Sequence, residues 1–326
     1  MEEVNVVVEL QTVWGWQPAL YLFLGGVGAG TFFVVGLVHL ITKAHGKAVA
    51  IAMWSAVAFL AVGLGLLVLE LSAPLRALMM WQSFSNVGSS WMAIGAWLLF
   101  VAIVCFVAAA LANTEIVFRY VKVAEGVRDK LGRAFTVAGV ILGLCVAVYT
   151  GILLMDAPGV PFWNTALLPV LFTVSALDTG VAFTAIVFAV AEPREHGVPR
   201  VLEIGTICLI VAEALVLALF LKTMLAGGDP LFETMEPGYA ATAAASANCW
   251  LSGDLAGMFW VLLVAVGLAF PLASAIIQVF WWPRHTRIAA LSAAVCVLAG
   301  GCTLRFITLL AGAHVDVLVN AVAMIA

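Results

Sequence analysis

The residues that could do chemistry in this sequence are polar side chains that stand inside long apolar runs. Gln17 and Tyr21 are four residues apart in such a run, which places them on one face of a helix. Gly25 and Gly28 continue the same stripe. The spacing therefore predicts a polar notch with a smooth glycine floor, in which a phenol and an amide can form hydrogen bonds.

A second glycine pair lies in the same stretch. Gly26 and Gly30 are spaced so that another helix, or a flat ligand, can approach the backbone closely. The alternative interpretation is that Trp14, Gln17 and Tyr21 only anchor a helix at the membrane–water interface and that the glycines only pack helices together.

Ionisable side chains occur within other apolar runs, where each requires a partner or a role. Asp178 and Glu213 fall near mid-membrane and Glu203 falls nearer one surface, an order that suggests a ladder of carboxylates for proton movement. The alternative is that Arg305 neutralises Asp178 or Glu213 as a structural ion pair. A separate polar group gathers toward the opposite surface. It consists of Gln17, Tyr21, Glu70, Tyr149, Asp156, Asp254, Arg305 and His314.

The histidines and cysteines argue against a metal cofactor held by this protein. A b-type haem needs two axial ligands at matching depth on facing helices. His39 and His314 fall at opposite ends of their runs, and the remaining histidines lie in connecting segments. No Cys-x-x-Cys pair occurs. We therefore expect neither haem nor an iron–sulfur cluster in this chain.

Composition shows which elements must position these groups. The chain has 326 residues, of which 65% are hydrophobic and 10% are charged. A soluble domain has about 45–50% apolar and about 25% charged residues. The sequence thus predicts a polytopic membrane protein. Its N-terminus has neither a basic segment nor a small-residue cleavage site, so we expect the first helix to be retained.

Eight apolar runs are long enough to cross the hydrocarbon core, which takes about 20 residues. They are residues 17–41, 48–71, 90–112, 134–154, 169–191, 201–225, 255–281 and 288–313. Alternate connecting segments hold eleven of the fourteen Lys and Arg residues. The positive-inside rule then places those segments in the cytoplasm. Both termini and the loops 72–89, 155–168 and 226–254 are expected to face outward.

The expected outer loops carry many aromatic residues. Such a surface suits docking of another protein, because aromatic rings supply contact area at low entropic cost. The alternative is that these rings rest on lipid headgroups. The residues concerned are Trp81, Phe84, Phe162, Trp163, Phe232, Tyr239 and Trp250.

Several blocks of the sequence resemble the NrfD/PsrC family, the membrane subunits of respiratory complexes such as polysulfide reductase. The most specific block joins Tyr149-Thr150-Gly151 to Pro161-Phe162-Trp163-Asn164. An acidic-x-x-x-Pro-x-Arg turn runs from Glu70 to Arg76. The other matching blocks are Trp14–Gly30, Leu168–Phe172 and Leu304–Phe306.

The resemblance implies an all-α integral membrane fold of eight transmembrane helices in two four-helix bundles. We assign residues 1–154 to the first bundle and residues 155–326 to the second. The resemblance also implies a quinone pocket in the first bundle near the outer face, with menaquinone or ubiquinone as the ligand. An iron–sulfur, ferredoxin-like subunit is expected to dock on the outer side and to serve a molybdopterin or multihaem catalytic subunit.

The resemblance further implies that the protein is not catalytic alone and that it lies, surrounded by lipid, in a prokaryotic cytoplasmic (inner) membrane. No contact with nucleic acid is expected. Whether quinone chemistry is coupled to proton translocation, the direction of electron flow and the substrate of the complex are left open.

Individual roles follow where residues match the family pattern. Tyr149 corresponds to the quinone-binding tyrosine of the fourth helix and Arg305 to the arginine of the last helix. Gln17 and Tyr21 correspond to the first-helix polar pair, although the polysulfide reductase version has Asn and His where this sequence has Pro18 and Tyr21. A phenol still donates a hydrogen bond to a quinone carbonyl. Glu70 or Asp156 would exchange the proton at the ring oxygen.

Two other classes of function compete with this interpretation. A secondary transporter would bind an ion or a substrate at Asp178 and Glu213. Transporters usually have inverted repeats and paired Gly/Pro interruptions, whereas only Pro271 stands inside a span and the two halves have no convincing repeat. The third possibility is a passive membrane anchor with a degenerate pocket.

Overall fold

The computed structural model describes residues 15–42, 46–70, 90–114, 125–157, 159–191, 200–231, 238–281 and 287–314. Within these ranges the chain forms helices and turns and has no strand. The helices are α1 (Trp16–Thr42), α2 (Lys47–Glu70), α3 (Trp91–Ala112), α5 (Glu125–Met155), α6 (Leu167–Ala191), α7 (Arg200–Leu225), α8 (Tyr239–Leu251), η2 (Met258–Ala269), α9 (Phe270–Ile276), η3 (Ile277–Trp281) and α10 (Arg287–Leu310). The π-helical segments η2 and η3 flank α9 and continue it in both directions.

Eight of these helices, with η2, α9 and η3 counted as one, are long and apolar enough to cross a membrane. The prediction of an all-α protein with eight membrane-spanning helices is confirmed at this level. The fourth span begins earlier than predicted, because Arg128, Asp129, Lys130 and Arg133 lie within the first turns of α5. These charged residues are compatible with a helix, so they mark where the apolar part begins and not where the helix begins.

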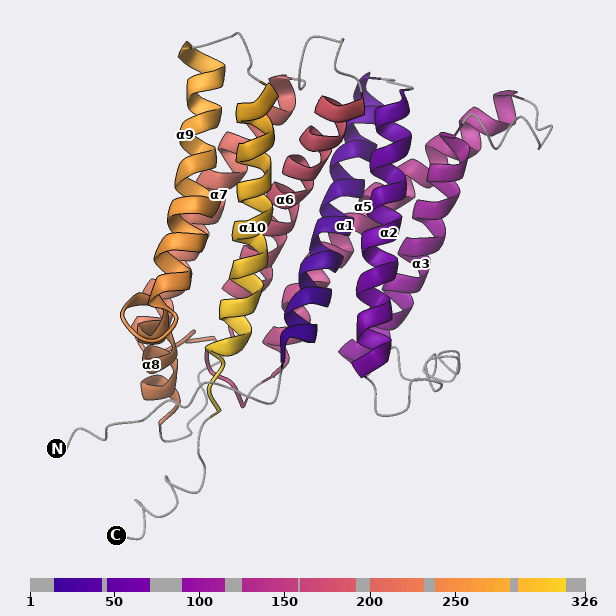
Figure 1. Cartoon of the computed structure of the whole chain (residues 1–326). Helices are drawn as coiled ribbons and strands as arrows, with labels where there is room; N and C mark the ends of the chain where they lie inside the picture. The colour runs from indigo at the N-terminus through magenta and orange to yellow at the C-terminus, as the bar shows by residue number, and fades with distance from the viewer. Residues whose placement is uncertain are drawn as a thin grey trace, which may run out of the picture.

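Helix α1 lies at the centre of the assembly. It packs against α2, α5, α6 and α10, and 67% of its membrane window is buried inside the protein, against 28% for α2. Figure 1 shows the long helices side by side, with α3 toward one edge, α9 at the other and α1 between them. The residues of α1 are therefore in reach of most of the other helices.

Glycines let α1 take this central place. A Cβ atom on Gly30 would overlap the carbonyl group of Ala176 in α6, so the two backbones touch at this level. A Cβ on Gly28 would lie 3.0 Å from the carbonyl oxygen of Ala56 in α2. The interpretation of Gly30 as a site where a second helix approaches closely is confirmed, and that helix is α6.

The segment that follows α5 folds back against the end of α10. The indole of Trp163 donates a hydrogen bond to the carbonyl oxygen of Thr308 at 2.8 Å, and that of Trp250 in α8 donates to Ile307 at 3.0 Å. The last four carbonyl groups of a helix have no partner within it. Both indoles thus donate to carbonyl groups in the last turn of α10, and the Ile307 carbonyl also accepts from the Ala311 N–H at 3.0 Å.

For four of the aromatic residues, this fold-back contradicts both interpretations, the docking surface and the contact with lipid headgroups. Phe162, Trp163, Tyr239 and Trp250 are at most 1% exposed. Their rings pack inside the protein because the indole N–H groups reach helix carbonyls and the Tyr239 hydroxyl donates to Asn164 at 3.3 Å. Trp81, Phe84 and Phe232 lie outside the described residues, as does the turn from Ser72 to Arg76.

Candidate functional site

Three of the predicted site residues converge from three different helices. Tyr21 of α1 lies within electrostatic range of both Glu70, the last residue of α2, and Tyr149 of α5. Gln17 stands one helical turn before Tyr21, at the start of α1. The predicted stripe on α1 therefore faces the end of α2 and the last turns of α5.

The phenol of Tyr149 is positioned by a glycine of α3. A Cβ atom built on Gly95 would overlap the Tyr149 ring and its hydroxyl oxygen. The Tyr149 side chain is 8% exposed, so it fills the space that Gly95 leaves open. Sequence reasoning did not single out Gly95, since one glycine in an apolar run does not indicate which helix will approach it.

The hydroxyl groups of the two tyrosines are candidates for binding a ligand. Neither Tyr21 nor Tyr149 makes a hydrogen bond through its hydroxyl to another described residue. Glu70 is exposed at the same end of the helices. Two phenols and one carboxyl group can thus donate hydrogen bonds to ring oxygens and exchange protons with them. These residues fit a quinone.

Asp156 lies just beyond α5, on the same side of the protein. It is seven residues after Tyr149, which corresponds to two turns and about 10 Å along the helix axis, and it is exposed. Its backbone N–H still donates to the carbonyl of Ile152 at 3.0 Å. This carboxyl group is therefore placed between the tyrosine cluster and the surface.

Arg305 of α10 lies against α6 and α1. Its guanidinium donates to the hydroxyl of Ser175, to the carbonyl of Gly301 at 3.0 Å and to the carbonyl of Phe172 at 3.2 Å. The same group stacks over the Phe172 ring, 5.0 Å from its centroid. A Cβ on Gly26 would lie 3.2 Å from it, so Gly26 provides the space for the guanidinium.

Glu213 of α7 is the acidic partner of Arg305. It interacts electrostatically with the guanidinium and forms a hydrogen bond with the Ser175 hydroxyl. Both side chains are buried, at 3% and 1% exposure. Ser175 therefore accepts a hydrogen bond from Arg305 and connects it to the Glu213 carboxylate, a link that the sequence did not indicate.

Asp178 stands beside this ion pair. Its carboxyl group is 1% exposed and lies within electrostatic range of Glu213. Neither of its oxygens has a hydrogen-bond partner among the described residues. The structure thus brings Asp178, Glu213 and Arg305 together, with two acids and one cation in a buried cluster.

Glu203 is separated from that cluster. It precedes Glu213 by ten residues on α7, about 15 Å along the axis. It lines a cavity of about 40 Å³ together with Thr206 and Gln278. The amide oxygen of Gln278 is buried without a partner among the described residues. The lining is otherwise mostly apolar. A cavity of this size has room for a water molecule that the Glu203 carboxyl and the Gln278 amide can bind.

The described residues contain no group of three or more His, Cys, Asp or Glu side chains arranged to hold a metal ion. The candidate site is therefore built from phenol, carboxyl and guanidinium groups.

Comparison with known proteins covers nearly the whole sequence. The family model described as "Polysulphide reductase, NrfD" matches residues 6–316. The C subunit of polysulfide reductase from Wolinella succinogenes is 25% identical over 96% of this protein and 96% of its own length. Protein NrfD of Escherichia coli is 26% identical over 92% of this protein and 95% of its own length.

Proposed function

Because the chain belongs to the polysulphide reductase NrfD family, we propose that it is the quinone-reactive membrane subunit of a multisubunit oxidoreductase. The family match confirms the resemblance drawn from the sequence motifs. Eight membrane-competent helices and the names of both relatives indicate a membrane anchor of an oxidoreductase complex. The quinone site and the direction in which the complex faces are our inference.

The observation that carries the proposal is the convergence of Tyr21, Glu70 and Tyr149 at one end of α1, α2 and α5. Two phenol hydroxyls without a described partner stand next to one exposed carboxyl group. Gly95 fixes the position of the Tyr149 ring from the side of α3. Four helices, α1, α2, α3 and α5, therefore contribute residues to one cluster. We keep the assignment of these helices to a first bundle as part of the proposal.

In this site the residues would bind and orient a ring that carries two oxygens. When bound, a quinol would supply two electrons and two protons, and a quinone would accept them. Tyr149 and Tyr21 donate hydrogen bonds to ring oxygens, and the Gln17 amide lies one turn further out on the same stripe. Glu70 takes up or releases a proton at the ring oxygen, and Asp156 passes it to the surface.

The same geometry supports a docking position for the partner subunit. Electron transfer between subunits requires a short distance, so the partner must dock next to the tyrosine cluster. We propose that an iron–sulfur, ferredoxin-like subunit binds at the Tyr149 end of the helices and passes electrons to or from a molybdopterin or multihaem catalytic subunit. The Lys and Arg distribution favours the outer side for this end.

The roles of the buried charges follow from their contacts. Arg305 has its hydrogen bonds and its acidic partner within α6, α7 and α10, so we assign it and Glu213 to a structural ion pair. Asp178 has no hydrogen bond to a described residue and is the better candidate for a proton-carrying group. The Glu203 cavity is the candidate entry to that path.

The first test removes one hydroxyl group. Tyr149→Phe should lower quinol turnover of the purified complex by roughly two- to twelve-fold, since a neutral hydrogen bond contributes about 0.5–1.5 kcal/mol. Tyr239→Phe is the matched control, because its hydroxyl bonds to Asn164 in the other half of the protein. Both variants should assemble. Equal turnover in both would make Tyr149 a packing residue.

A second variant moves the hydroxyl without removing it. Gly95→Ala places a methyl group where the phenol now lies, so it should displace Tyr149 and weaken quinone binding. Gly65→Ala is the control, because no atom lies within 4 Å of a Cβ at that position. Wild-type binding in Gly95→Ala, with assembly intact, would contradict the proposed pocket.

A further inference from the structure

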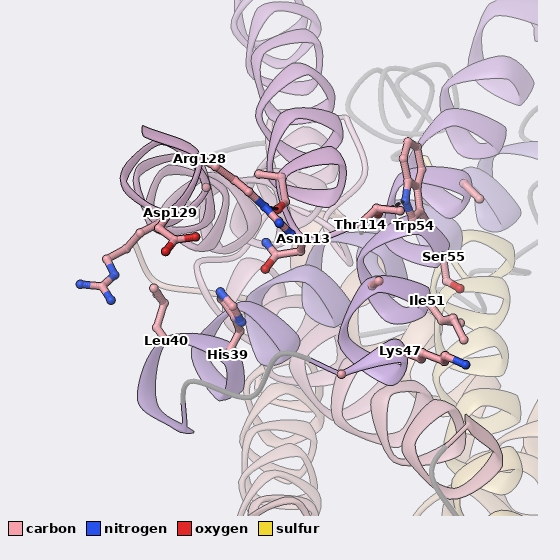
Figure 2. Close-up of a pocket in the computed structure, with 16 residues that line it drawn as sticks. His39, Leu40, Lys47, Ile51, Trp54, Ser55, Asn113, Thr114, Arg128 and Asp129 are labelled. Carbon is pink, nitrogen blue, oxygen red and sulfur yellow. Dashed lines mark hydrogen bonds between the residues drawn. The ribbon is translucent and has the colours of Figure 1, made fainter. Parts of the chain in front are cut away.

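A cavity of about 1040 Å³ lies at the end of the helices opposite the tyrosine cluster. It is lined by the last turn of α1, the first turns of α2, the end of α3 and the first turns of α5 (Figure 2). Its α5 residues, such as Arg133, precede Tyr149 by at least 16 positions, which is about 24 Å along the helix. The cavity is thus separate from the proposed quinone pocket.

The charged residues of the lining are mainly cationic. Lys47, Arg128 and Arg133 line the cavity, with Asp129 as the acidic residue among them. Arg128 donates to the carbonyl of Ala112 at 3.2 Å, which holds it at the end of α3. Lys47 and Arg133 are exposed and make no hydrogen bond or ion pair with another described residue. The rim therefore carries an excess of positive charge.

The remaining lining is apolar and open to the surroundings of the bundle. Leu40, Ile51 and Trp54 lie in it, and Ile51 and Trp54 are 47% and 38% exposed. The Trp54 indole donates to the Thr114 hydroxyl at 3.0 Å, so its ring is fixed between α2 and α3. The cavity therefore has an apolar wall, formed by Leu40, Ile51 and Trp54, beside its cationic residues. Both lie at the level where the membrane spans end.

We propose that this cavity binds an anionic phospholipid. The phosphate group would lie against Lys47, Arg128 and Arg133, and the acyl chains would run along Leu40, Ile51 and Trp54. Basic pockets between transmembrane helices at the membrane surface favour anionic headgroups. The volume of about 1040 Å³ lies at the upper end of the roughly 300–1,000 Å³ of typical ligand sites. A neutral quinone ring would bring no negative charge to a lining that holds Lys47, Arg128 and Arg133 against the single acid Asp129. The proposal does not depend on the proposed function.

The test compares two lipids that differ only in headgroup charge. The purified full-length protein is given phosphatidylglycerol and phosphatidylcholine with identical acyl chains, and bound lipid is measured by native mass spectrometry. Wild type should retain phosphatidylglycerol in preference. Lys47→Gln/Arg133→Gln should lose roughly 25-fold in this preference, since each basic residue contributes about five-fold near a charged headgroup.

The control removes the same charge elsewhere. Lys130→Gln/Lys222→Gln changes two exposed lysines that do not line the cavity, and it should keep the wild-type preference within two-fold. Equal losses in both double variants would overturn the proposal, as would equal retention of the two lipids by wild type. Thermal unfolding of both variants should match wild type, which separates lost binding from lost folding.

Two competing ligands test whether the cavity is specific for a phospholipid. Inorganic phosphate at millimolar concentration should leave the bound lipid in place, because it lacks acyl chains for the apolar wall. A menaquinone analogue should also leave it in place. Displacement by phosphate would make this an anion site without lipid specificity, and displacement by the analogue would make it a second quinone site. Either result would overturn the proposal.

Discussion

The two carboxyl groups of the buried cluster, Asp178 and Glu213, have different roles in our account. One guanidinium stands against two carboxyl groups, and Glu213 is the one that shares Ser175 with Arg305. Two neighbouring acids disfavour a second negative charge. We therefore infer that Glu213 is the counter-charge of Arg305 and that Asp178 is the acid that gains and loses a proton.

Amide substitutions test this division. Asp178→Asn should leave the ion pair intact, so the complex should assemble at full yield and oxidise quinol while proton movement slows. Glu213→Gln should leave Arg305 without a counter-charge, which typically costs about 3–5 kcal/mol, and the complex should assemble poorly. The measurement is proton uptake or release by proteoliposomes alongside quinol oxidation, with yield and thermal stability recorded.

The contradicting outcomes differ for the two variants. Full yield and unchanged proton movement in Asp178→Asn would leave that acid without a role in proton transfer. A stable, fully assembled Glu213→Gln variant would show that the guanidinium does not require the carboxylate.

Residue types alone could predict some of this chemistry. The spacing of Gln17 and Tyr21 predicted their shared face, and the family motif around Tyr149 indicated that residue as a ligand, which stays a prediction. Gly95 and Ser175 were missed, because a glycine or serine in an apolar run has no partner until the register between two helices is known. The partner of Arg305 was left open for the same reason, since a long side chain reaches several turns.

At the scale of elements, the close contact between helices α1 and α6 positions the buried cluster. Their backbones meet where Gly30 faces Ala176 and Gly180. Small residues permit such contacts in membranes, where van der Waals packing drives helix association. The contact holds Asp178 and Ser175 of α6 at a fixed distance from α1, so the buried cluster depends on it.

A methyl group at this contact should be destabilising. Gly30→Ala would overlap the carbonyl of Ala176, and overpacking typically costs about 1–3 kcal/mol. We expect a lower thermal unfolding temperature in detergent. Gly65→Ala should leave that temperature unchanged or raise it, because its Cβ meets no atom and alanine favours the helix. An unchanged Gly30→Ala protein would mean that α1 and α6 are less closely packed than described.

Hydropathy predicted the long elements but not the short ones. The spans were found because about 20 apolar residues fit few structures other than a membrane helix. Helix α8 and the fold-back at Trp163 were not predicted, because their aromatic and small residues suit a loop equally well. Their position depends on hydrogen bonds to the end of α10, which no local pattern shows.

At the scale of the whole molecule, the charges on the connecting segments predict its orientation. The cationic cavity lies at the end of α5 that contains Arg128 and Arg133, and the tyrosine cluster lies at the opposite end. A reporter that is active only in the cytoplasm should be active when it is fused after Arg128 and silent when it is fused after Gly238. Reversed activities would place the proposed quinone pocket on the cytoplasmic side.

Binding of the quinone itself tests the central proposal most directly. A photoreactive quinone analogue should label the purified complex at the Tyr149 end of α1, α3 and α5, within a few residues of Tyr21, Gly95 and Tyr149. Excess unlabelled quinone should abolish the labelling, and Gly95→Ala should reduce it. Specific labelling confined to the cationic cavity near Arg133, or to α7 and α10 around Arg305, would contradict the proposed site.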